Sequence, residues 1–326
     1  MEYRNLGNSG LKISTISLGT NNFGGRTDMA ETQAVVDKAL DQGISMFDTA
    51  DAYPTDPHLW GKSEEFLGKA LGARRKDIVL ASKFGMPMGA GPYMNGGSRR
   101  YIMNAVEASL KRLGTDYIDL YQMHFPDAST PLEETLLALG DLVQQGKVRY
   151  IGCCNFKGHV LVDAVRTAQK LGVPQFVSVQ NFYNILRRDV EDERLAAAKY
   201  VGVGFLPYFP LASGMLTGKY KRGEKPAAGT RFGEGSNMAG LGGLEMNDRN
   251  FDLVEKIEAF GKERNLSVLE IAVAWLLAQP GVTSVMAGAT KPAQIEQNVA
   301  AAGAKLSAED VKALNDMTKP MGGLPF

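Results

Sequence analysis

Residues 15–25 read TISLGTNNFGG, a short apolar run that leads directly into a turn rich in glycine and asparagine. The run predicts a buried strand, and the helical pattern from Ala30 makes this turn the first strand-to-helix connection. Doubly wound sheets that bind dinucleotides carry G-x-G-x-x-G at this connection. Residues 19–25, GTNNFGG, do not have that spacing. Among folds that alternate strands and helices, the turn therefore favours a barrel over a doubly wound sheet.

The same alternation of strand and helix continues from this turn along the chain. Strands are predicted at Thr15–Leu18, Ile44–Asp48, Ile78–Lys83, Tyr117–Met123, Val148–Cys154, Phe176–Gln180, Val203–Leu206 and Ser284–Ala287. Helices are predicted at Ala30–Gln42, Ser63–Leu71, Ser98–Leu113, Pro131–Gln145, His159–Leu171, Val190–Tyr200 and Pro292–Ala302, with Ser63 and Ser98 as capping residues. Eight strands that alternate with helices predict an α/β fold, a (β/α)8 TIM barrel that occupies residues 1–326 as one domain.

Three further segments add to the minimal barrel. A β-hairpin is predicted before the first strand, from Tyr3–Arg4 and Leu11–Ile13. A long Gly-rich connection follows the seventh strand, from Pro207 to Asp248, and a connection of this length is typical of a lid or a cofactor strap. An extra helix at Ser307–Met317 and a tail complete the chain.

The composition and local sequence patterns argue against several classes of binding partner. Lys and Arg together number 36, as do Asp and Glu, so no net charge favours a nucleic acid or an anionic membrane. No run of about 18 apolar residues predicts a transmembrane helix, and the first residues lack the pattern of a signal peptide. Cys153 and Cys154 are neighbours in a strand and point to opposite faces, which disfavours a disulfide. His58, Asp51 and Asp56 match no spacing of metal ligands, so no metal is predicted. These features predict a cytoplasmic protein, monomer or homo-oligomer, that acts on a small molecule.

Polar side chains stand at three consecutive strand ends, where another Val or Leu would be the ordinary residue. Asp48 ends the second strand and is followed by Tyr53, Lys83 ends the third strand, and His124 follows the fourth. Taken singly, they have ordinary interpretations: a turn or helix cap, a rim aromatic and a core histidine. Because catalytic side chains of α/β barrels come from the carboxyl ends of the strands, the four together predict an active site.

These four residue types suit the reduction of a carbonyl group. The oxygen that becomes negative as hydride arrives must receive a proton, and Tyr53 could supply it. A tyrosine has an ordinary pKa of about 10, so we expect a cationic Lys83 nearby to lower the pKa of Tyr53. Asp48 could hold Lys83 charged, and His124 could donate a hydrogen bond to the substrate oxygen.

The chain resembles the aldo-keto reductase superfamily over essentially its whole length, in the branch of bacterial reductases and potassium-channel β-subunits. The resemblance rests on FDTADAY (47–53), GKSEEFLGKAL (61–71), ASKFG (81–85), SLKRLGTDYIDLYQMH (109–124), GKVRYIG (146–152) and LTGKY (216–220). It implies a TIM barrel that binds NADP(H) or NAD(H) in extended form. It also implies a catalytic tetrad at Asp48, Tyr53, Lys83 and His124.

The resemblance implies cofactor contacts along the whole barrel mouth. Around the nicotinamide they are Gly19, Thr20, Asn21, Asp48, Cys154, Asn155, Gln180 and the stacking aromatic Tyr208. Along the diphosphate they are Phe209, Pro210, Leu211, Ala212, Ser213 and Gly214, with Lys219 and Arg231 as clamping cations of the strap. At the adenosine end they are Gly288, Ala289, Thr290, Lys291, Gln294, Gln297 and Asn298.

The chain departs from the family pattern at both ends of the predicted cofactor. Cys154 replaces the usual serine, which exchanges a strong hydrogen-bonding group for a weak one. Gly288, Ala289 and Gln294 stand where the strongly NADP-selective branch has Lys, Ser and Arg. Since Thr290, Lys291 and Gln294 could still bind a 2′-phosphate, NADP(H) is favoured and NAD(H) remains open.

The function expected is NADP(H)-dependent reduction of aldehydes or ketones, with a carbonyl or alcohol as substrate. Two alternatives stay open: a cofactor-binding partner protein like the channel β-subunits, whose turnover is incidental, and a barrel of another chemistry. An apolar substrate wall is expected from Phe23, Trp60, Phe84, Tyr93 and Phe125.

Overall fold

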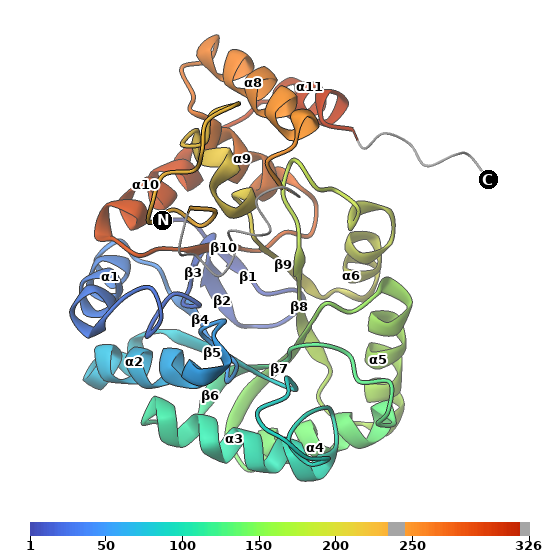
Figure 1. The fold of residues 1–326 in the computed structure, drawn as a ribbon. Helices are drawn as coiled ribbons and strands as arrows, with labels where there is room; N and C mark the ends of the chain where they lie inside the picture. The colour runs from blue at the N-terminus through green and yellow to red at the C-terminus, as the bar shows by residue number, and fades with distance from the viewer. Residues whose placement is uncertain (234–244, 320–326) are drawn as a thin grey trace.

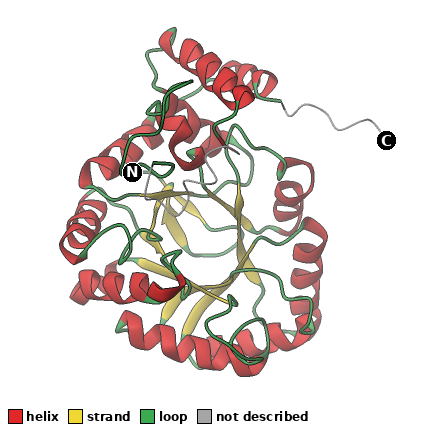
Figure 2. Ribbon diagram, in the orientation of Figure 1, coloured by secondary structure: helices red, strands yellow, loops and turns green. Residues whose placement is uncertain are grey.

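Eight parallel strands form the centre of the molecule, and helices surround them (Figure 1, Figure 2). This computed structural model describes residues 1–233 and 245–319, so residues 234–244 of the long connection and 320–326 of the tail lie outside the described residues. The barrel strands are β3 (Ile16–Gly19), β4 (Met46–Asp48), β5 (Val79–Phe84), β6 (Ile118–Met123), β7 (Val148–Cys154), β8 (Phe176–Phe182), β9 (Gly204–Tyr208) and β10 (Val285–Gly288).

The strands close into a barrel in sequence order. Their order is β10-β3-β4-β5-β6-β7-β8-β9, and every neighbouring pair is parallel. The Phe205 amide donates to the Gly281 carbonyl at 3.0 Å, and the Thr283 amide donates to the Phe205 carbonyl at 3.0 Å, which joins β9 to the segment before β10. The predicted (β/α)8 barrel is confirmed, and its strand boundaries lie within two residues of those expected, with β7 matching at both ends.

Helices cover the outside of the barrel (Figure 1). They are α1 (Met29–Asp41), α2 (Lys62–Leu71), α3 (Arg99–Leu113), α4 (Leu132–Gln144), α5 (Gly158–Leu171), α6 (Ala196–Val201), α8 (Asp248–Lys262), α9 (Val268–Ala278), α10 (Pro292–Gly303) and α11 (Ala308–Met317). Ser98 caps α3 as expected, because its hydroxyl accepts a hydrogen bond from the Tyr101 amide. The extra carboxyl-terminal helix is present as α11.

Two helical expectations need correction. Ser63 does not cap α2, which begins at Lys62; its buried hydroxyl instead donates to the Thr20 carbonyl at 2.8 Å. The helix predicted at Val190–Tyr200 begins as a π-helical turn at Glu191–Leu195 before it continues as α6.

The sequence did not predict the helices α8 and α9, which lie between β9 and β10. The α9 sequence VLEIAVAWLLA is apolar on nearly every side, and its Trp275 is fully buried. A helix of this composition has no polar face, so the one-sided pattern that predicts a surface helix is missing.

The amino-terminal hairpin closes one end of the barrel. Strands β1 (Tyr3–Asn5) and β2 (Lys12–Ser14) pair antiparallel, as the sequence predicts. Leu6 and Ile13 from this hairpin pack in one buried cluster with Met46, Leu120 and Leu206 of the barrel interior. Ligand access is therefore left to the opposite end, where the carboxyl ends of the strands lie.

In the described ranges, no helix combines the length and the apolar character needed to cross a membrane. Cys153 and Cys154 are both buried free thiols, as their positions in the strand predict.

Candidate active site

A cavity of about 730 Å³ lies at the mouth formed by the strand ends. Every residue predicted above to contact a cofactor lines it, except Ala212, which is buried behind. Sequence reasoning missed further lining residues, which come from the turn after β3, the loop after β4, the strap, α9 and β10: Asn22, Arg26, Thr55, Thr217, Gly229, Thr230, Leu269, Met286 and Ala287.

Lys83 is the centre of the predicted tetrad. Its side chain is fully buried, and its Nζ donates to Asp48 Oδ2 at 2.6 Å and to the Thr49 carbonyl at 2.9 Å. The same Nζ lies 3.4 Å from the Tyr53 hydroxyl. Asp48, Tyr53 and His124 line the cavity while Lys83 lies behind them. The structure therefore brings together all four residues, with the Lys83 ammonium directly between Asp48 and the Tyr53 phenol.

Asp48 is held by two buried amides as well as by Lys83. Gln122 Nε2 donates to Asp48 Oδ1 at 3.0 Å, and Gln180 Nε2 donates to the same oxygen at 3.2 Å. Gln122 was missed in the sequence, although it stands two residues before His124 in β6 and so shares the face that points into the barrel. These bonds satisfy the remaining carboxylate oxygen and fix the orientation of Asp48.

The electrostatics of the Lys83–Tyr53 pair differ from the expectation. Burial by itself would lower the pKa of Lys83, but the Asp48 carboxylate, together with Tyr53 and Cys154, outweighs burial and holds that pKa above its usual value. The pKa of Tyr53 is raised, because exclusion of solvent from its phenol outweighs the lowering by Lys83. The expected net lowering of the Tyr53 pKa is therefore wrong in this structure. Tyr53 is a protonated phenol at neutral pH.

His124 is neutral at physiological pH. Burial lowers the pKa of its imidazole to about 3, and the positive charge of Lys83 adds to the effect. Its ring meets the Tyr53 ring edge-on, with 5.7 Å between the centroids. Within the described residues, the buried His124 Nδ1 has no hydrogen-bond partner. A neutral imidazole in this place can donate one hydrogen bond but cannot act as the proton source.

Asn155 links His124 to Tyr208, an aromatic residue that lines the cavity. Its Nδ2 donates to the His124 carbonyl at 2.9 Å, and its Oδ1 accepts from the Tyr208 hydroxyl at 2.8 Å. Asn155 adopts a φ of 63°, a conformation that Asn tolerates better than most residues. The neighbouring Cys154 thiol lies 3.9 Å from Gln122 Oε1, so it is in contact with the network around Asp48.

Cations gather along the rest of the cavity. Arg26, Lys219, Arg231 and Lys291 line it, whereas Asp48, already paired with Lys83, is the single acidic residue among its described lining. Arg26 also donates to the Gly229 carbonyl at 2.8 Å, which ties the turn after β3 to the strap. The cavity is therefore suited to an elongated anion.

The far end of the cavity lies at the start of α10. Gln294 Oε1 accepts from the Thr290 amide at 2.7 Å and from the Lys291 amide at 3.2 Å. The side-chain oxygen of Gln294 therefore holds this turn in place. The Nε2 group of Gln294 and the ammonium group of Lys291 are the donors that could contact a ligand. A helix amino terminus adds partial positive charge at this end.

The expected aromatic substrate wall is largely wrong. Phe23 and Phe84 are fully buried in the hydrophobic core, and Phe84 packs on Tyr121 with 4.8 Å between ring centroids. Neither Trp60 nor Tyr93 lines the cavity. Phe125 does line it and stacks on His124 with 5.3 Å between the centroids.

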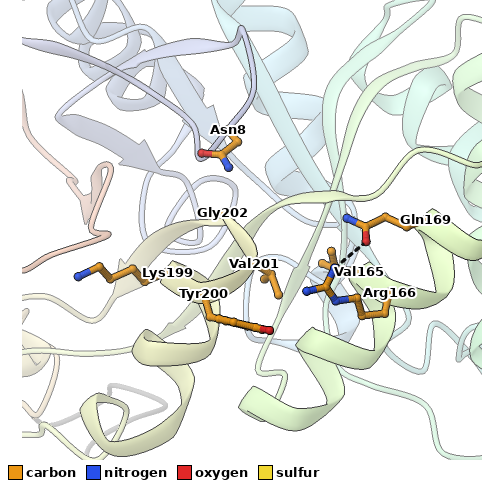
Figure 3. A pocket seen from close by; sticks show the side chains of 8 residues that line it. All are labelled: Asn8, Val165, Arg166, Gln169, Lys199, Tyr200, Val201 and Gly202. Atoms are coloured by element: carbon orange, nitrogen blue, oxygen red, sulfur yellow. Dashed lines mark hydrogen bonds between the residues drawn. The ribbon is translucent and has the colours of Figure 1, made fainter.

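A second cavity, of about 220 Å³, lies beside the amino-terminal hairpin and between α5 and α6 (Figure 3). Arg166 donates to Gln169 there at 3.1 Å, and Asn8 and Tyr200 contribute to the walls. Lys199 and Tyr200 also line it, but its described lining includes no carboxylate and no histidine, so the candidate site is the larger cavity. Across residues 1–233 and 245–319, no cluster of His, Cys, Asp and Glu could hold a metal ion.

The comparisons with known proteins agree with this geometry. The model of the "Aldo/keto reductase family" matches residues 15–319. The chain is 36% identical to "L-glyceraldehyde 3-phosphate reductase" of Escherichia coli (strain K12), over 92% of this chain and 87% of the relative. It is 37% identical to "Probable voltage-gated potassium channel subunit beta" of Arabidopsis thaliana, over 92% of this chain and 91% of the relative. It is 38% identical to "Uncharacterized oxidoreductase YrpG" of Bacillus subtilis, over 99% and 98% of the two chains. The match over nearly the whole chain, together with the barrel and its mouth, shows that the protein belongs to the aldo/keto reductase family.

Proposed function

We propose that the protein is an NADP(H)-dependent oxidoreductase that reduces aldehydes or ketones to alcohols, with Tyr53 as the general acid. The observation that carries this proposal is the buried Lys83 Nζ, which lies 2.6 Å from Asp48 and 3.4 Å from the Tyr53 hydroxyl at the wall of the cavity. Membership of the family and the reductases among its relatives support an oxidoreductase.

The cavity fits an extended nicotinamide dinucleotide. Amide and thiol groups of Asn155, Gln180 and Cys154 stand at one end for a carboxamide, and Tyr208 presents an aromatic ring beside them. Cations and the amino terminus of α10 lie at the other end, where phosphates would bind. The cofactor supplies the hydride when it is bound.

The residues of the site supply the proton and orient the substrate oxygen. Tyr53 donates its phenolic proton to the oxygen of the carbonyl group as that oxygen gains negative charge. Lys83, kept cationic by Asp48, stabilises the tyrosinate that remains. Neutral His124 orients the carbonyl group by donating a hydrogen bond to the same oxygen.

The direct test is a steady-state assay with reduced cofactor and a panel of aldehydes and ketones. We expect cofactor oxidation that depends on the carbonyl and forms the alcohol in equal amount. A second candidate, a cofactor-binding regulatory partner, is supported by the 37% identity to a channel β-subunit. Cofactor binding without turnover on any carbonyl would favour that candidate.

Cys154→Ser is expected to keep or tighten cofactor binding. A serine hydroxyl forms stronger hydrogen bonds than a thiol, both to Gln122 and to a carboxamide. The measurement is the dissociation constant of NADP(H) by fluorescence. Cys153→Ser is the matched control, because Cys153 belongs to the hydrophobic core; it should lower stability and leave affinity unchanged. Weaker binding by Cys154→Ser would mean that the thiol is needed for packing.

Lys291→Ala is expected to erode a preference for NADP(H) over NAD(H). A single lysine acts as a point charge without the bidentate geometry of arginine, so we expect a preference of roughly ten- to a hundredfold, or about 1.4–2.8 kcal/mol. The variant should weaken NADP(H) and barely change NAD(H), whereas exposed Lys305→Ala should change neither. Equal losses for both cofactors would show that Lys291 does not recognise the 2′-phosphate.

A further inference from the structure

A second group of buried polar side chains comes from the turn after β4 and from α2, α3 and β6. Asp51, two residues before Tyr53, is 1% exposed, and Tyr101 of α3 is 4% exposed. Glu64 of α2 and Tyr121 of β6 are fully buried beside them. The proposed reaction uses none of these groups.

The Tyr101 hydroxyl joins the two segments that carry Tyr53 and Lys83. Its Oη lies 3.3 Å from Asp51 Oδ2, in the turn that leads to Tyr53, and 3.1 Å from the Met86 carbonyl, which follows β5. The Asp51 amide donates to the Lys83 carbonyl at 3.3 Å in the same place. This junction therefore ties the turn that leads to Tyr53 to strand β5, which carries Lys83, and to Met86 after it.

The number of hydrogens available for hydrogen bonds indicates the protonation state of Asp51 at this junction. Tyr101 has one hydroxyl hydrogen, whereas both of its neighbours, a carboxylate and a carbonyl, are acceptors. If Asp51 is a neutral acid, its O–H donates to Tyr101 Oη, and Tyr101 donates to the Met86 carbonyl. If Asp51 is ionised, the buried Asp51 carboxylate and the part-buried Met86 carbonyl compete for one hydrogen, and only one of them can accept it.

We propose that Asp51, held as a neutral carboxylic acid, is a positioning residue that locks the Tyr53 and Lys83 segments together through Tyr101, and that its ionisation at alkaline pH unlocks them. The proposal rests on the proposed reductase function for its activity readout.

The charges around Asp51 favour the neutral acid. Burial, with the Glu64 carboxylate as the next cause, raises the pKa of Asp51 to about 8, and Arg112 and the Tyr101 hydroxyl oppose the shift. Arg112 is committed to Glu64, since its Nε donates to Glu64 Oε2 at 2.6 Å. Within the described residues, Asp51 Oδ1 and the Tyr121 hydroxyl have no hydrogen-bond partner. The backbone amide of Ala52 also favours the Asp51 carboxylate, but burial and Glu64 outweigh the groups that favour ionisation.

The test compares Asp51→Asn with the wild type across alkaline pH. An asparagine amide can donate to Tyr101 Oη but cannot ionise, so it keeps the junction at every pH. Between about pH 7 and pH 9 we expect kcat/KM of the wild type to fall about tenfold and that of Asp51→Asn to fall less than about twofold. Ionisation of Tyr53 would occur at higher pH, because its pKa is raised above its usual value of about 10. Parallel pH profiles for the two proteins would overturn the proposal.

Two tyrosine variants test the junction itself. Tyr101→Phe removes the shared hydroxyl and should lower kcat about three- to tenfold at neutral pH with unchanged affinity for the cofactor. Tyr121→Phe is the matched control, a buried tyrosine of the same group, and should keep the wild-type kcat. Equal effects of the two substitutions would contradict the role of Tyr101.

A stability measurement separates this proposal from the proposed function. The unfolded chain loses the Asp51 proton near its ordinary pKa of about 4, whereas the folded chain keeps it until about pH 8. The folded state therefore binds more protons in this interval, and the free energy of unfolding falls as pH rises. Asp51→Asn should lack this contribution, so the difference between the two proteins changes with pH. If the difference in the free energy of unfolding between the two proteins did not change with pH, Asp51 would not be a neutral acid in the folded protein. This conclusion would hold even if the protein reduced no carbonyl.

Discussion

Replacing Tyr53 with phenylalanine is expected to lower the rate of carbonyl reduction by about 10²–10⁴-fold while cofactor affinity stays nearly unchanged. The substitution removes the proposed proton donor and keeps the ring that meets His124. Lys83 retains its bonds to Asp48 and to the Thr49 carbonyl, so the buried charge stays compensated and the fold should be preserved.

The measurement is kcat with an aldehyde, together with the cofactor dissociation constant by fluorescence. Tyr200→Phe, at an exposed tyrosine on α6, serves as the control and should behave as the wild type. A Tyr53→Phe protein that kept more than about a tenth of the wild-type rate would rule out the phenol as the general acid.

The second large effect is expected from the strap. Lys219→Ala combined with Arg231→Ala should weaken NADP(H) and NAD(H) alike, because both cofactors carry the diphosphate that these cations would contact. Hydrogen bonds to charged groups contribute about 1.5–3 kcal/mol each. Allowing for incomplete additivity, we expect dissociation constants about 10²–10³-fold higher.

The control for this variant is Lys221→Ala combined with Lys225→Ala, which removes two exposed cations of the same segment that do not line the cavity. It equalises the change in net charge, so any difference between the two double variants comes from the position of the cations. Unchanged affinity of the Lys219 and Arg231 double variant for both cofactors would remove the strap from the binding site.

The positions of the tetrad could be predicted because they follow from strand geometry. Residues at the carboxyl ends of parallel strands converge on one mouth, so Asp48, Lys83 and His124 needed only correct strand ends to be placed together. Side chains alternate between the two faces of a strand, and this alternation also predicts that Phe84 does not line the cavity. Lys83 points into the barrel, so its neighbour Phe84 must point toward the helices, where it is buried against Tyr121.

Other features depend on tertiary contacts that a local pattern does not contain. The raised pKa of Tyr53 reflects how completely the surrounding protein excludes solvent from its hydroxyl. Ser63 has the residue type and place of a helix cap, yet its hydroxyl is used by Thr20, which is 43 residues away in the chain. Arg26 reaches the strap over an even longer separation, to Gly229.

The Lys83–Asp48 pair also ties the folding of this barrel to its proposed chemistry. Because both side chains are almost completely removed from water, loss of either partner alone leaves an uncompensated charge in the interior, which costs about 3–5 kcal/mol. Whole domains are commonly stable by only about 5–15 kcal/mol. A descendant of this chain that abandoned the reaction would therefore have little freedom to lose these two residues one at a time. Its most accessible evolutionary route is to keep the pair and change the substrate mouth, where Thr55 and Phe125 line the cavity outside that buried network.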